Sequence, residues 1–425
     1  MLDIKLIRTD PDAVKEGIRK RCLDLDAVVD EILSIDAARR ELGSKTDALK
    51  AEQNAASKDI PRLKKEGGDV AALMARMKEL SAKIKEDDAQ VAELEARQRS
   101  LMLSLPNLPD ADLEAGGKEN NRPVRTFGEP RSFDFEPKNH VELCESLGLI
   151  DYERGAKLGG NGSWVYRGMG SRLEWALLNY FIAEHLKDGY ELVLPPHMLN
   201  YECGTVAGQF PKFEDEVYKI ANPTSADSKF LLPTAETALV NLHRDEILSL
   251  EELPRKYIAY TPCYRREAGS YRSEERGMIR GHQFNKVEMV QYTTEDGSDA
   301  AFEELVGKAE RLVQGLGLHY RLSKLAAGDC SASMARTYDI EVWIPSMGIY
   351  KEVSSASNAR AYQARRGNIR YRGEDGKLHL CHTLNASGLA TSRVFPALVE
   401  QYQNADGSVT VPEVLRPFLG VDVIR

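Results

Sequence analysis

A hydrophobic repeat over residues 27–104 limits this chain to a small set of folds. In its first half the aligned positions follow in steps of four and three at Val28, Ile32, Ile35, Arg39, Leu42, Thr46, Leu49, Gln53, Ala56, Ile60 and Leu63. After a glycine-containing turn at 65–69 the spacing resumes at Val70, Leu73, Met77, Leu80, Ile84, Asp87, Val91, Leu94, Gln98, Leu101 and Leu105. Two such runs around one turn predict an antiparallel coiled-coil hairpin.

The predicted hairpin is long, and its seam is imperfect. At about 1.5 Å per residue, each helix should extend for roughly 50 Å. Five polar residues occupy seam positions, namely Arg39, Thr46, Gln53, Asp87 and Gln98. We expect these residues to weaken the core and to fix the register of the helices. Pro61 should kink or end the first helix, because proline lacks a backbone N–H.

The tip of the hairpin carries four basic residues, Lys58, Arg62, Lys64 and Lys65, among acidic neighbours. They fit equally well as a solvated helix end or as contacts to nucleic-acid phosphates. The net charge of −9 does not decide between these interpretations. A local basic patch can bind RNA even on an acidic protein.

Residues 106–130 break the helical periodicity with several prolines and glycines, and they predict a linker. The remainder, 131–425, predicts an α+β domain built on a mainly antiparallel sheet flanked by helices. Its expected strands lie at 257–264, 284–293, 338–344 and 350–354, and its clearest helices at 172–186 and 393–402.

The expected compartment is the cytoplasm, and no membrane association is expected. No apolar run approaches the roughly 20 residues that span a bilayer. The N-terminus lacks the basic start and apolar stretch of a secretory signal. Six cysteines are widely spaced without a CxxC pair, which favours reduced thiols over disulfides or a cysteine zinc site.

The segment 264–290 crowds basic and acidic residues between two strand-like runs. The segment predicts a strand, a long charged loop and a second strand. Alternation then places Arg265 and Glu267 on one face of the first strand, and Phe284 and Glu288 on one face of the second. Such a face offers a guanidinium for phosphate, carboxylates for amino groups and a ring for base stacking. The alternative is a solvated hairpin held by surface ion pairs.

Three further segments carry polar groups in apolar surroundings. In the first, Thr234 and Glu236 could clamp an ammonium group or, equally, start a helix. In the second, Glu352, Ser354, Ser355 and Asn358 are expected to end a strand, where their oxygens would suit magnesium bridging phosphates. Serines alone are also a turn signature.

The third segment contains Asn385, Ser387 and Gly388, which should form a polar strand end or turn before a helix that opens near Arg393. An arginine beside a helix N-terminus makes an anion site, although it can also merely solvate the first helical turn.

Taken in order, these motifs resemble those of class II aminoacyl-tRNA synthetases. YELVLPP, with Pro195 or Pro196, resembles motif 1; Arg265-x-Glu267 with Arg276-Gly277 resembles motif 2; and Arg393 matches the arginine of motif 3. The TAE triplet at 234–236, HQF at 282–284, EVSS at 352–355 and the ending VPEVLRPFLG are typical of the seryl-tRNA synthetase family. The N-terminal hairpin also fits that family.

The resemblance implies a homodimeric, cytoplasmic serine–tRNA ligase with an N-terminal tRNA-binding domain at 1–105, a linker at 106–130 and a class II catalytic domain at 131–425. It implies ATP with Mg²⁺, L-serine and tRNA(Ser) as substrates or cofactors. Whether tRNA(Sec) is also charged stays open.

The resemblance also implies roles for single residues. Arg265 would hold the ATP α-phosphate and Arg276 and Arg393 the β- and γ-phosphates, with Arg265 and Arg393 as the catalytic pair. Glu267 would read the adenine amino group and Phe284 would stack on adenine. Glu352 and Ser355 would orient magnesium, and Arg266, Val353 and Ser354 complete the predicted ATP site.

For serine, the resemblance implies that Thr234, Glu236 and Asn385 bind the α-amino end and that Glu288 and Ser387 engage the hydroxyl. Ala235 and Arg265 complete the predicted serine site. Lys58, Arg62, Lys64 and Lys65 would contact tRNA.

Two positions depart from the usual family pattern. Ala386 stands where glycine is common, which costs stability if the backbone there needs a positive φ. Ala356 replaces a frequent cysteine. Neither change removes a charged contact.

Two other functions would fit parts of the sequence. A synthetase-like enzyme that loads a carrier protein or small metabolite should lack the long hairpin. A non-catalytic RNA-binding or coiled-coil protein should have lost Arg265, Glu267, Glu288 or Arg393, and all four are present.

Overall fold

The structure is a computed structural model that describes residues 1–66, 69–221, 228–267 and 277–425. It divides into two compact units. One comprises Leu2–Arg19 and Asp24–Leu105, and the other comprises Met1, Lys20–Leu23 and Pro106–Arg425. Each unit is described by itself.

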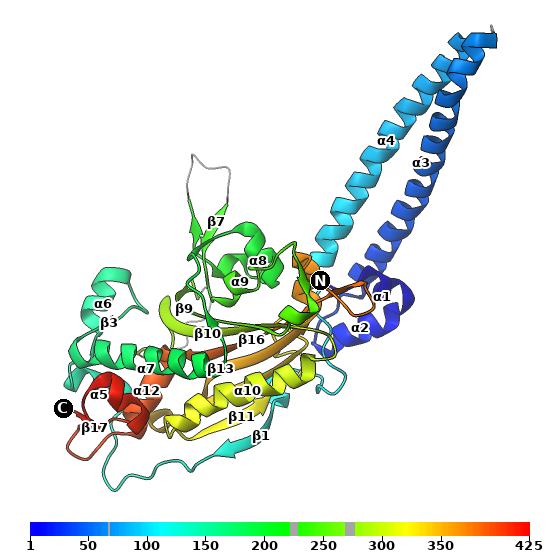
Figure 1. The fold of residues 1–425 in the computed structure, drawn as a ribbon. Coiled ribbons are helices and arrows are strands. Elements are labelled where there is room, and N and C mark those ends of the chain that lie inside the picture. The colour runs from blue at the N-terminus through cyan, green and yellow to red at the C-terminus, as the bar shows by residue number, and fades with distance from the viewer. Residues whose placement is uncertain (67–68, 222–227, 268–276) are drawn as a thin grey trace. The chain divides into compact units, whose positions relative to one another are not determined.

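The first unit is a helical hairpin with two short helices at its base (Figure 1). Its helices are α1 (Ile4–Thr9), α2 (Pro11–Lys20), α3 (Asp26–Glu66) and α4 (Val70–Ser104). The two long helices confirm the predicted coiled-coil arm. The Asp69 side chain caps α4 by accepting a hydrogen bond from the backbone N–H of Ala72 at 3.0 Å. Pro61 was expected to kink or end the first helix, and it does not end it, since α3 continues to Glu66.

A buried carboxylate ties three helices of the hairpin together. Asp36 on α3 is fully buried and accepts hydrogen bonds from Arg8 on α1 at 2.7 Å, from Arg40 at 2.9 Å and from Gln98 on α4 at 3.1 Å. Burial alone raises the pKa of Asp36, but the hydrogen bonds from Arg8, Gln98 and Arg40 outweigh it and lower the pKa to about 2. Gln98, which the repeat placed in the seam, therefore binds Asp36, a partner that the repeat did not indicate.

The second unit is built on an eight-stranded sheet of order β1-β11-β12-β13-β16-β10-β9-β4. Its strands are β1 (Arg122–Phe127), β4 (Glu191–Leu192), β9 (Arg255–Tyr264), β10 (Gln283–Thr293), β11 (Tyr320–Lys324), β12 (Arg336–Ile344), β13 (Ile349–Arg360) and β16 (His382–Ala390). All neighbours pair antiparallel except β4 with β9. The mainly antiparallel sheet is thus confirmed.

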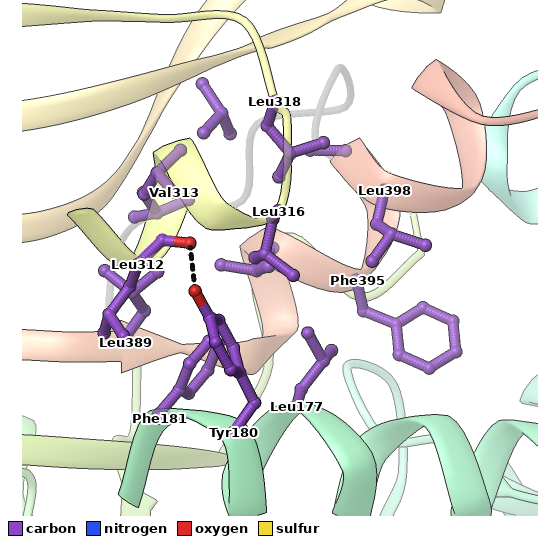
Figure 2. Close-up of a cluster of buried hydrophobic side chains, with 14 of the residues drawn as sticks. Leu177, Tyr180, Phe181, Leu312, Val313, Leu316, Leu318, Leu389, Phe395 and Leu398 are labelled. Atoms are coloured by element: carbon purple, nitrogen blue, oxygen red, sulfur yellow. Dashed lines mark hydrogen bonds between the residues drawn. The ribbon is translucent and has the colours of Figure 1, made fainter. Parts of the chain in front are cut away.

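One face of the sheet is apolar and packs against α7 (Gly168–Lys187), α10 (Ser298–Gly315) and α12 (Thr391–Gln401). Strand residues such as Val287, Met289 and Leu384 belong to this cluster. Figure 2 shows leucine and phenylalanine side chains from the three helices meeting there, with the Tyr180 hydroxyl donating to the Leu312 carbonyl at 3.3 Å. This packing fixes which strand residues face the other way, because side chains alternate along a strand.

The opposite face of the sheet carries a second cluster of buried hydrophobic residues and polar residues predicted for the site. The short helices α8 (Tyr201–Ala207), α9 (Glu236–Leu239) and α11 (Tyr362–Gly367) supply Ala207, Leu239 and Ala364 to it, together with Val290 and Tyr292 of β10. By alternation, Phe284, Lys286 and Glu288 share the face of Val290 and Tyr292.

The remaining elements lie around this body. The helices are α5 (His140–Ser146), α6 (Tyr152–Gly159) and α13 (Arg416–Leu419), with short 3-10 turns η1 (Lys118–Asn120), η2 (Glu214–Glu216), η3 (Leu250–Glu252), η4 (Pro345–Met347) and η5 (Glu413–Leu415). The small strands are β2 (Ile150–Asp151), β3 (Val165–Tyr166), β5 (Met198–Asn200), β6 (Lys219–Ile220), β7 (Lys229–Leu231), β8 (Ile247–Ser249), β14 (Arg370–Arg372), β15 (Leu378–Leu380), β17 (Val409–Thr410) and β18 (Val423–Ile424). The predicted linker range contains η1 and the edge strand β1, which the sequence did not indicate. Within the described part of the chain, no helix combines the length and the apolar character that crossing a bilayer requires.

Three local predictions were wrong. Strand β9 ends at Tyr264, so Arg265 and Glu267 lie beyond it, and Glu267 has a φ of 51°. Asn385 and Ser387 lie inside β16 rather than at a strand end or in a turn. Asn385 pairs with strands on both sides, and Ser387 pairs with Glu288 of β10. The group from Glu352 to Asn358 lies inside β13 and does not end it. Ala386 is a buried strand residue without a positive φ, so its side chain brings no backbone strain.

Candidate active site

Three adjoining cavities lie on the polar face of the sheet, and Arg393 lines all of them. One of about 330 Å³ is lined by Thr234, Glu236 and Arg265, and one of about 360 Å³ by Asp339 and Glu352. A narrow one of about 40 Å³ lies among Arg265, Glu352 and Arg393. A larger cavity of about 570 Å³ lies elsewhere, beside α5 and α6, and shares none of these residues.

An arginine and an aromatic ring meet where β9 and β10 run side by side. The Arg265 guanidinium lies 5.2 Å from the centroid of the Phe284 ring, and its Nε donates to the Pro233 carbonyl at 3.2 Å. Glu267 accepts a hydrogen bond from Arg280 Nε at 2.7 Å. A cation, a flat ring and a carboxylate within one short stretch can hold a phosphate and a purine base.

The second arginine lies at the start of α12. Arg393 donates to the backbone carbonyl of Glu352 at 2.9 Å and lies 3.4 Å from its carboxylate. Burial raises the pKa of Glu352, but the positive charges of Arg393, Arg265 and Lys286 outweigh it and leave the pKa lowered. Three cations around one carboxylate leave a net positive field, which suits polyphosphate.

Glu352 has a second acidic neighbour across the strands. Ser355 on β13 donates to the carboxylate of Asp339 on β12. Burial and then the negative charge of Glu352 raise the pKa of Asp339 well above its ordinary value. Among the described residues no group of three or more His, Cys, Asp or Glu side chains could hold a metal ion unaided. Glu352 and Ser355 fit magnesium only where phosphate oxygens supply further ligands.

A buried lysine joins two of the predicted serine-binding residues. Lys286 Nζ donates to Thr234 Oγ1 at 2.7 Å and lies 2.5 Å from Glu288 Oε2. Both Lys286 and Glu288 are buried. The sequence analysis did not select Lys286, although its position between Phe284 and Glu288 on one strand face was a usable signal.

The carboxylate of Glu236 lies at the start of α9 and is held by Gln363. Gln363 Nε2 donates to Glu236 Oε1 at 2.7 Å. Burial, followed by the negative charge of Glu288, raises the pKa of Glu236 to about 7. A cationic ligand bound beside this carboxylate would therefore stabilise its charged form. No local signal in the sequence indicated Gln363.

Some of the other predicted site residues line the cavities, and the rest are buried within the fold. Val353 and Ser387 line the narrow cavity. Ser354 is fully buried and donates to the Ser387 carbonyl at 2.6 Å, so it joins β13 to β16. Asn385 is buried and its Nδ2 lies 3.8 Å from Met334 Sδ, and Ala235 is buried in the cluster beneath α9.

Two predicted arginines do not join this group. Arg266 donates to the Asp215 carbonyl at 3.0 Å through its side chain and to the Glu216 carbonyl at 2.9 Å through its backbone. Arg276 lies outside the described residues.

At the tip of the arm, Lys58, Arg62 and Lys65 are exposed. Arg62 pairs with Asp59 at 3.1 Å. The side chain of Lys64 lies outside the described part of the chain.

Two protein families match the chain. Residues 1–109 match the family described as seryl-tRNA synthetase N-terminal domain. Residues 218–402 match the class II core domain of the tRNA synthetases for G, H, P, S and T.

Relatives match over the full length. A serine–tRNA ligase 2 of Clostridium acetobutylicum is 61% identical over 99% of this chain and 100% of its own. A serine–tRNA ligase of Thermotoga neapolitana is 48% identical over 100% of both chains. Among solved structures, the seryl-tRNA synthetase of Pyrococcus horikoshii complexed with ATP has a TM-score of 0.93 at 34% identity, covering 100% of this chain and 99% of the other. The cytoplasmic serine–tRNA ligase of Naegleria fowleri in complex with AMP has a TM-score of 0.88 at 29% identity, with the same coverage.

Proposed function

This chain belongs to the seryl-tRNA synthetase family and is a serine–tRNA ligase, and from that premise we propose how its residues carry out the reaction. L-Serine and ATP react to seryl-adenylate and diphosphate, and the seryl group then passes to the 3′ end of tRNA. The observation that supports this proposal is that arginines suited to phosphate and carboxylates suited to an ammonium group line adjoining cavities on one face of the sheet.

ATP binds between the two arginines. Adenine stacks on Phe284, Glu267 accepts from its amino group, and Arg265 holds the α-phosphate. Arg393, with Arg276, holds the β- and γ-phosphates. The lowered pKa of Glu352 keeps this carboxylate ionised beside three cations, which supports its role next to bound nucleotide.

Glu352 and Ser355 would hold the magnesium ion that accompanies ATP. When bound, the ion supplies charge neutralisation for the polyphosphate. Asp339, which accepts from Ser355, orients that serine from the neighbouring strand.

Serine binds on the side of Thr234, Glu236 and Asn385, which face its α-amino end, while Glu288 and Ser387 engage its hydroxyl. A buried hydroxyl site rejects alanine, because the lost hydrogen bonds leave polar groups stranded. The buried position of Glu288 beside Lys286 supports this selectivity.

Chemistry needs no covalent enzyme intermediate. The serine carboxylate attacks the α-phosphorus in line, diphosphate leaves, and the tRNA 3′-terminal hydroxyl later attacks the adenylate carbonyl. Arg265 and Arg393 stabilise the negative charge that develops on the phosphates, so positioning and electrostatics supply the acceleration.

Residues 1–105 act as the tRNA-binding domain, residues 106–130 connect it, and residues 131–425 are the catalytic domain. Lys58, Arg62, Lys64 and Lys65 contact tRNA phosphates at the tip of the arm. Exchanging the four for glutamine should weaken tRNA binding and flatten its dependence on salt, because fewer counterions are then released.

The enzyme works as a cytoplasmic homodimer, because the reaction belongs where tRNA and ATP meet and because α7 and the segment after β4 expose large apolar side chains. Trp175 is 53% exposed and Leu194 is 75% exposed. Contiguous patches of exposed apolar side chains commonly mark subunit interfaces, and we propose that these side chains belong to one. Sedimentation of the wild type and of Leu194→Glu tests this assignment, and a monomeric wild type would refute it.

The decisive measurement is serine-dependent ATP–pyrophosphate exchange, with the other amino acids as controls. Exchange with serine alone is expected, and exchange with another amino acid but not serine would refute the specificity. Charging of tRNA(Ser) and of tRNA(Sec) transcripts then shows whether the second tRNA is also a substrate.

A further inference from the structure

Gln363 is a buried residue that contacts the serine site only through another side chain. It lies on α11 and is 0% exposed. Its Nε2 donates to Glu236 Oε1 at 2.7 Å and to the Ala207 carbonyl at 2.9 Å. Its Oε1 accepts from the Thr383 hydroxyl at 2.6 Å. Both amide hydrogens and the amide oxygen are therefore engaged.

This network permits only one orientation of the amide. Reversing it would turn the amide oxygen toward the Glu236 carboxylate and the Ala207 carbonyl, which are both acceptors. The same reversal would turn the amide nitrogen toward the Thr383 hydroxyl. Because a hydroxyl can also accept, the two acceptors Glu236 and Ala207 fix this orientation, and Thr383 anchors the amide oxygen.

Further hydrogen bonds hold α11, the helix that carries Gln363, against the rest of the domain. Arg366, one helical turn after Gln363, is buried and donates to the carbonyls of Thr205 and Phe210 at 2.8 and 2.9 Å. These bonds fasten α11 to the α8 region. Thr383 lies on β16, two residues before Asn385, so the amide is held from a helix and from the sheet.

We infer that Gln363 is a positioning residue for the amino acid: by occupying Oε1 of Glu236, it orients this carboxylate and leaves Oε2 for the ammonium group of serine. This inference rests on the proposed role of Glu236 in serine binding. Among the described residues, no hydrogen bond occupies Glu236 Oε2. Glu236 also lines the cavity of about 330 Å³.

Electrostatics make this support necessary. The charged groups that act on Glu236 are Glu288, which disfavours its ionisation, and Lys286 and Arg265, which favour it. The Gln363 hydrogen bond lowers the pKa of Glu236 against burial and the charge of Glu288. Losing that bond should leave Glu236 protonated at neutral pH, and a neutral carboxyl attracts an ammonium group weakly.

The test is steady-state ATP–pyrophosphate exchange with the full-length chain and with Gln363→Met. Removing one hydrogen bond to a charged group should raise KM for serine about tenfold to a hundredfold. KM for ATP should be unchanged. The acidic limb of kcat/KM for serine should move to higher pH, so that alkaline buffer partly restores the variant.

Two inhibitors isolate the ammonium group. Serinol keeps the ammonium and the hydroxyl but lacks the carboxylate, and its inhibition constant should rise in Gln363→Met. 3-Hydroxypropanoate lacks the ammonium, and its constant should not change. Equal changes for both compounds would overturn the inference.

Matched variants separate positioning from stability. Gln401→Met removes another buried glutamine that bridges two backbone groups, at 2.8 and 3.0 Å, and it should leave KM for serine unchanged. Thr383→Val should reproduce part of the Gln363→Met effect, and Thr383→Ser should not, because serine retains the hydroxyl. These two variants decide the matter even if Gln363→Met fails to fold.

The outcomes also distinguish this inference from the proposed function. If the wild type shows no serine-dependent exchange, the proposed function fails. If the wild type is active and Gln363→Met keeps its KM for serine and its pH profile, only the positioning role fails.

Discussion

The exposed ion pairs of the arm contrast with a buried ion pair in the second unit. In the arm, most ion pairs lie in solvent: Lys50 and Asp88, paired at 2.7 Å across the two helices, are 44% and 50% exposed. In the catalytic unit, Lys286 and Glu288 are 7% and 3% exposed at 2.5 Å. Exposed pairs contribute little to stability, whereas a buried charge requires a partner. The exposed Lys50–Asp88 pair therefore adds little to stability, whereas Lys286, which lines the narrow cavity, depends on its buried partner.

Asp36 is the exception that sharpens this comparison. It is as buried as the site carboxylates, yet its partners lower its pKa, whereas burial and a like charge raise the pKa of Glu236. A carboxylate surrounded by donors stabilises the fold. A buried carboxylate with few hydrogen-bond donors around it is available to bind a ligand.

The largest expected effect comes from removing the arm. Replacing Leu42–Leu94 by a short glycine-rich turn should reduce tRNA charging by about a hundredfold or more, as expected when several phosphate contacts are lost. Serine-dependent exchange should persist, because the site lies within the other compact unit. Both activities are measured on the same preparation. Equal loss of the two would contradict the assignment of tRNA binding to the arm.

Next in size is the loss of the buried carboxylate in the arm. Asp36→Asn should destabilise the arm by about 2 kcal/mol at pH 7, the equivalent of a pKa lowered from 3.8 to about 2. Because the folded pKa lies below the unfolded one, this stability exists above pH 4 and disappears as the pH falls toward 2. Denaturant unfolding followed by circular dichroism at 222 nm measures it. The difference between wild type and variant should vanish in acid, and a difference independent of pH would contradict the prediction.

A smaller effect concerns serine activation as a function of pH. Since the pKa of Glu236 is about 7, its protonation should reduce kcat/KM for serine about tenfold for each pH unit below 7. The exchange assay between pH 5.5 and 8.5 measures this limb, with Glu236→Gln as the variant that should lack it. If kcat/KM for serine of the wild type did not change over that pH range, Glu236 would not be the residue that binds the ammonium group.

The smallest effect belongs to the exposed pairs of the arm. The coupling energy between Lys50 and Asp88, from a double-mutant cycle with Lys50→Gln and Asp88→Asn, should stay below about 1 kcal/mol and should fall with added salt. A coupling as large as the effect of Asp36→Asn would erase the contrast between exposed and buried charge.

The sequence predicted the arm well, because a heptad repeat is a local pattern that specifies its own partner surface. It also indicated most residues of the candidate site, since Arg265, Phe284, Glu288 and Arg393 stand in recognisable motifs. It failed where strand boundaries mattered. Whether β9 ends before Arg265, and whether β16 continues through Ser387, depends on pairing with neighbouring strands, which local patterns do not encode.

The sequence by itself determined the helical hairpin, the α+β class of the body and the chemical groups available to the site. Only the tertiary structure decided how those groups act: that Lys286 bridges Thr234 and Glu288, that Gln363 orients Glu236, and that Asp36 joins three helices. The contacts of Arg8 with Asp36, of Lys286 with Thr234 and of Gln363 with Glu236 join residues 28, 52 and 127 positions apart. The physical reason is that burial and long-range partners, rather than residue type, set the charge and direction of a carboxylate.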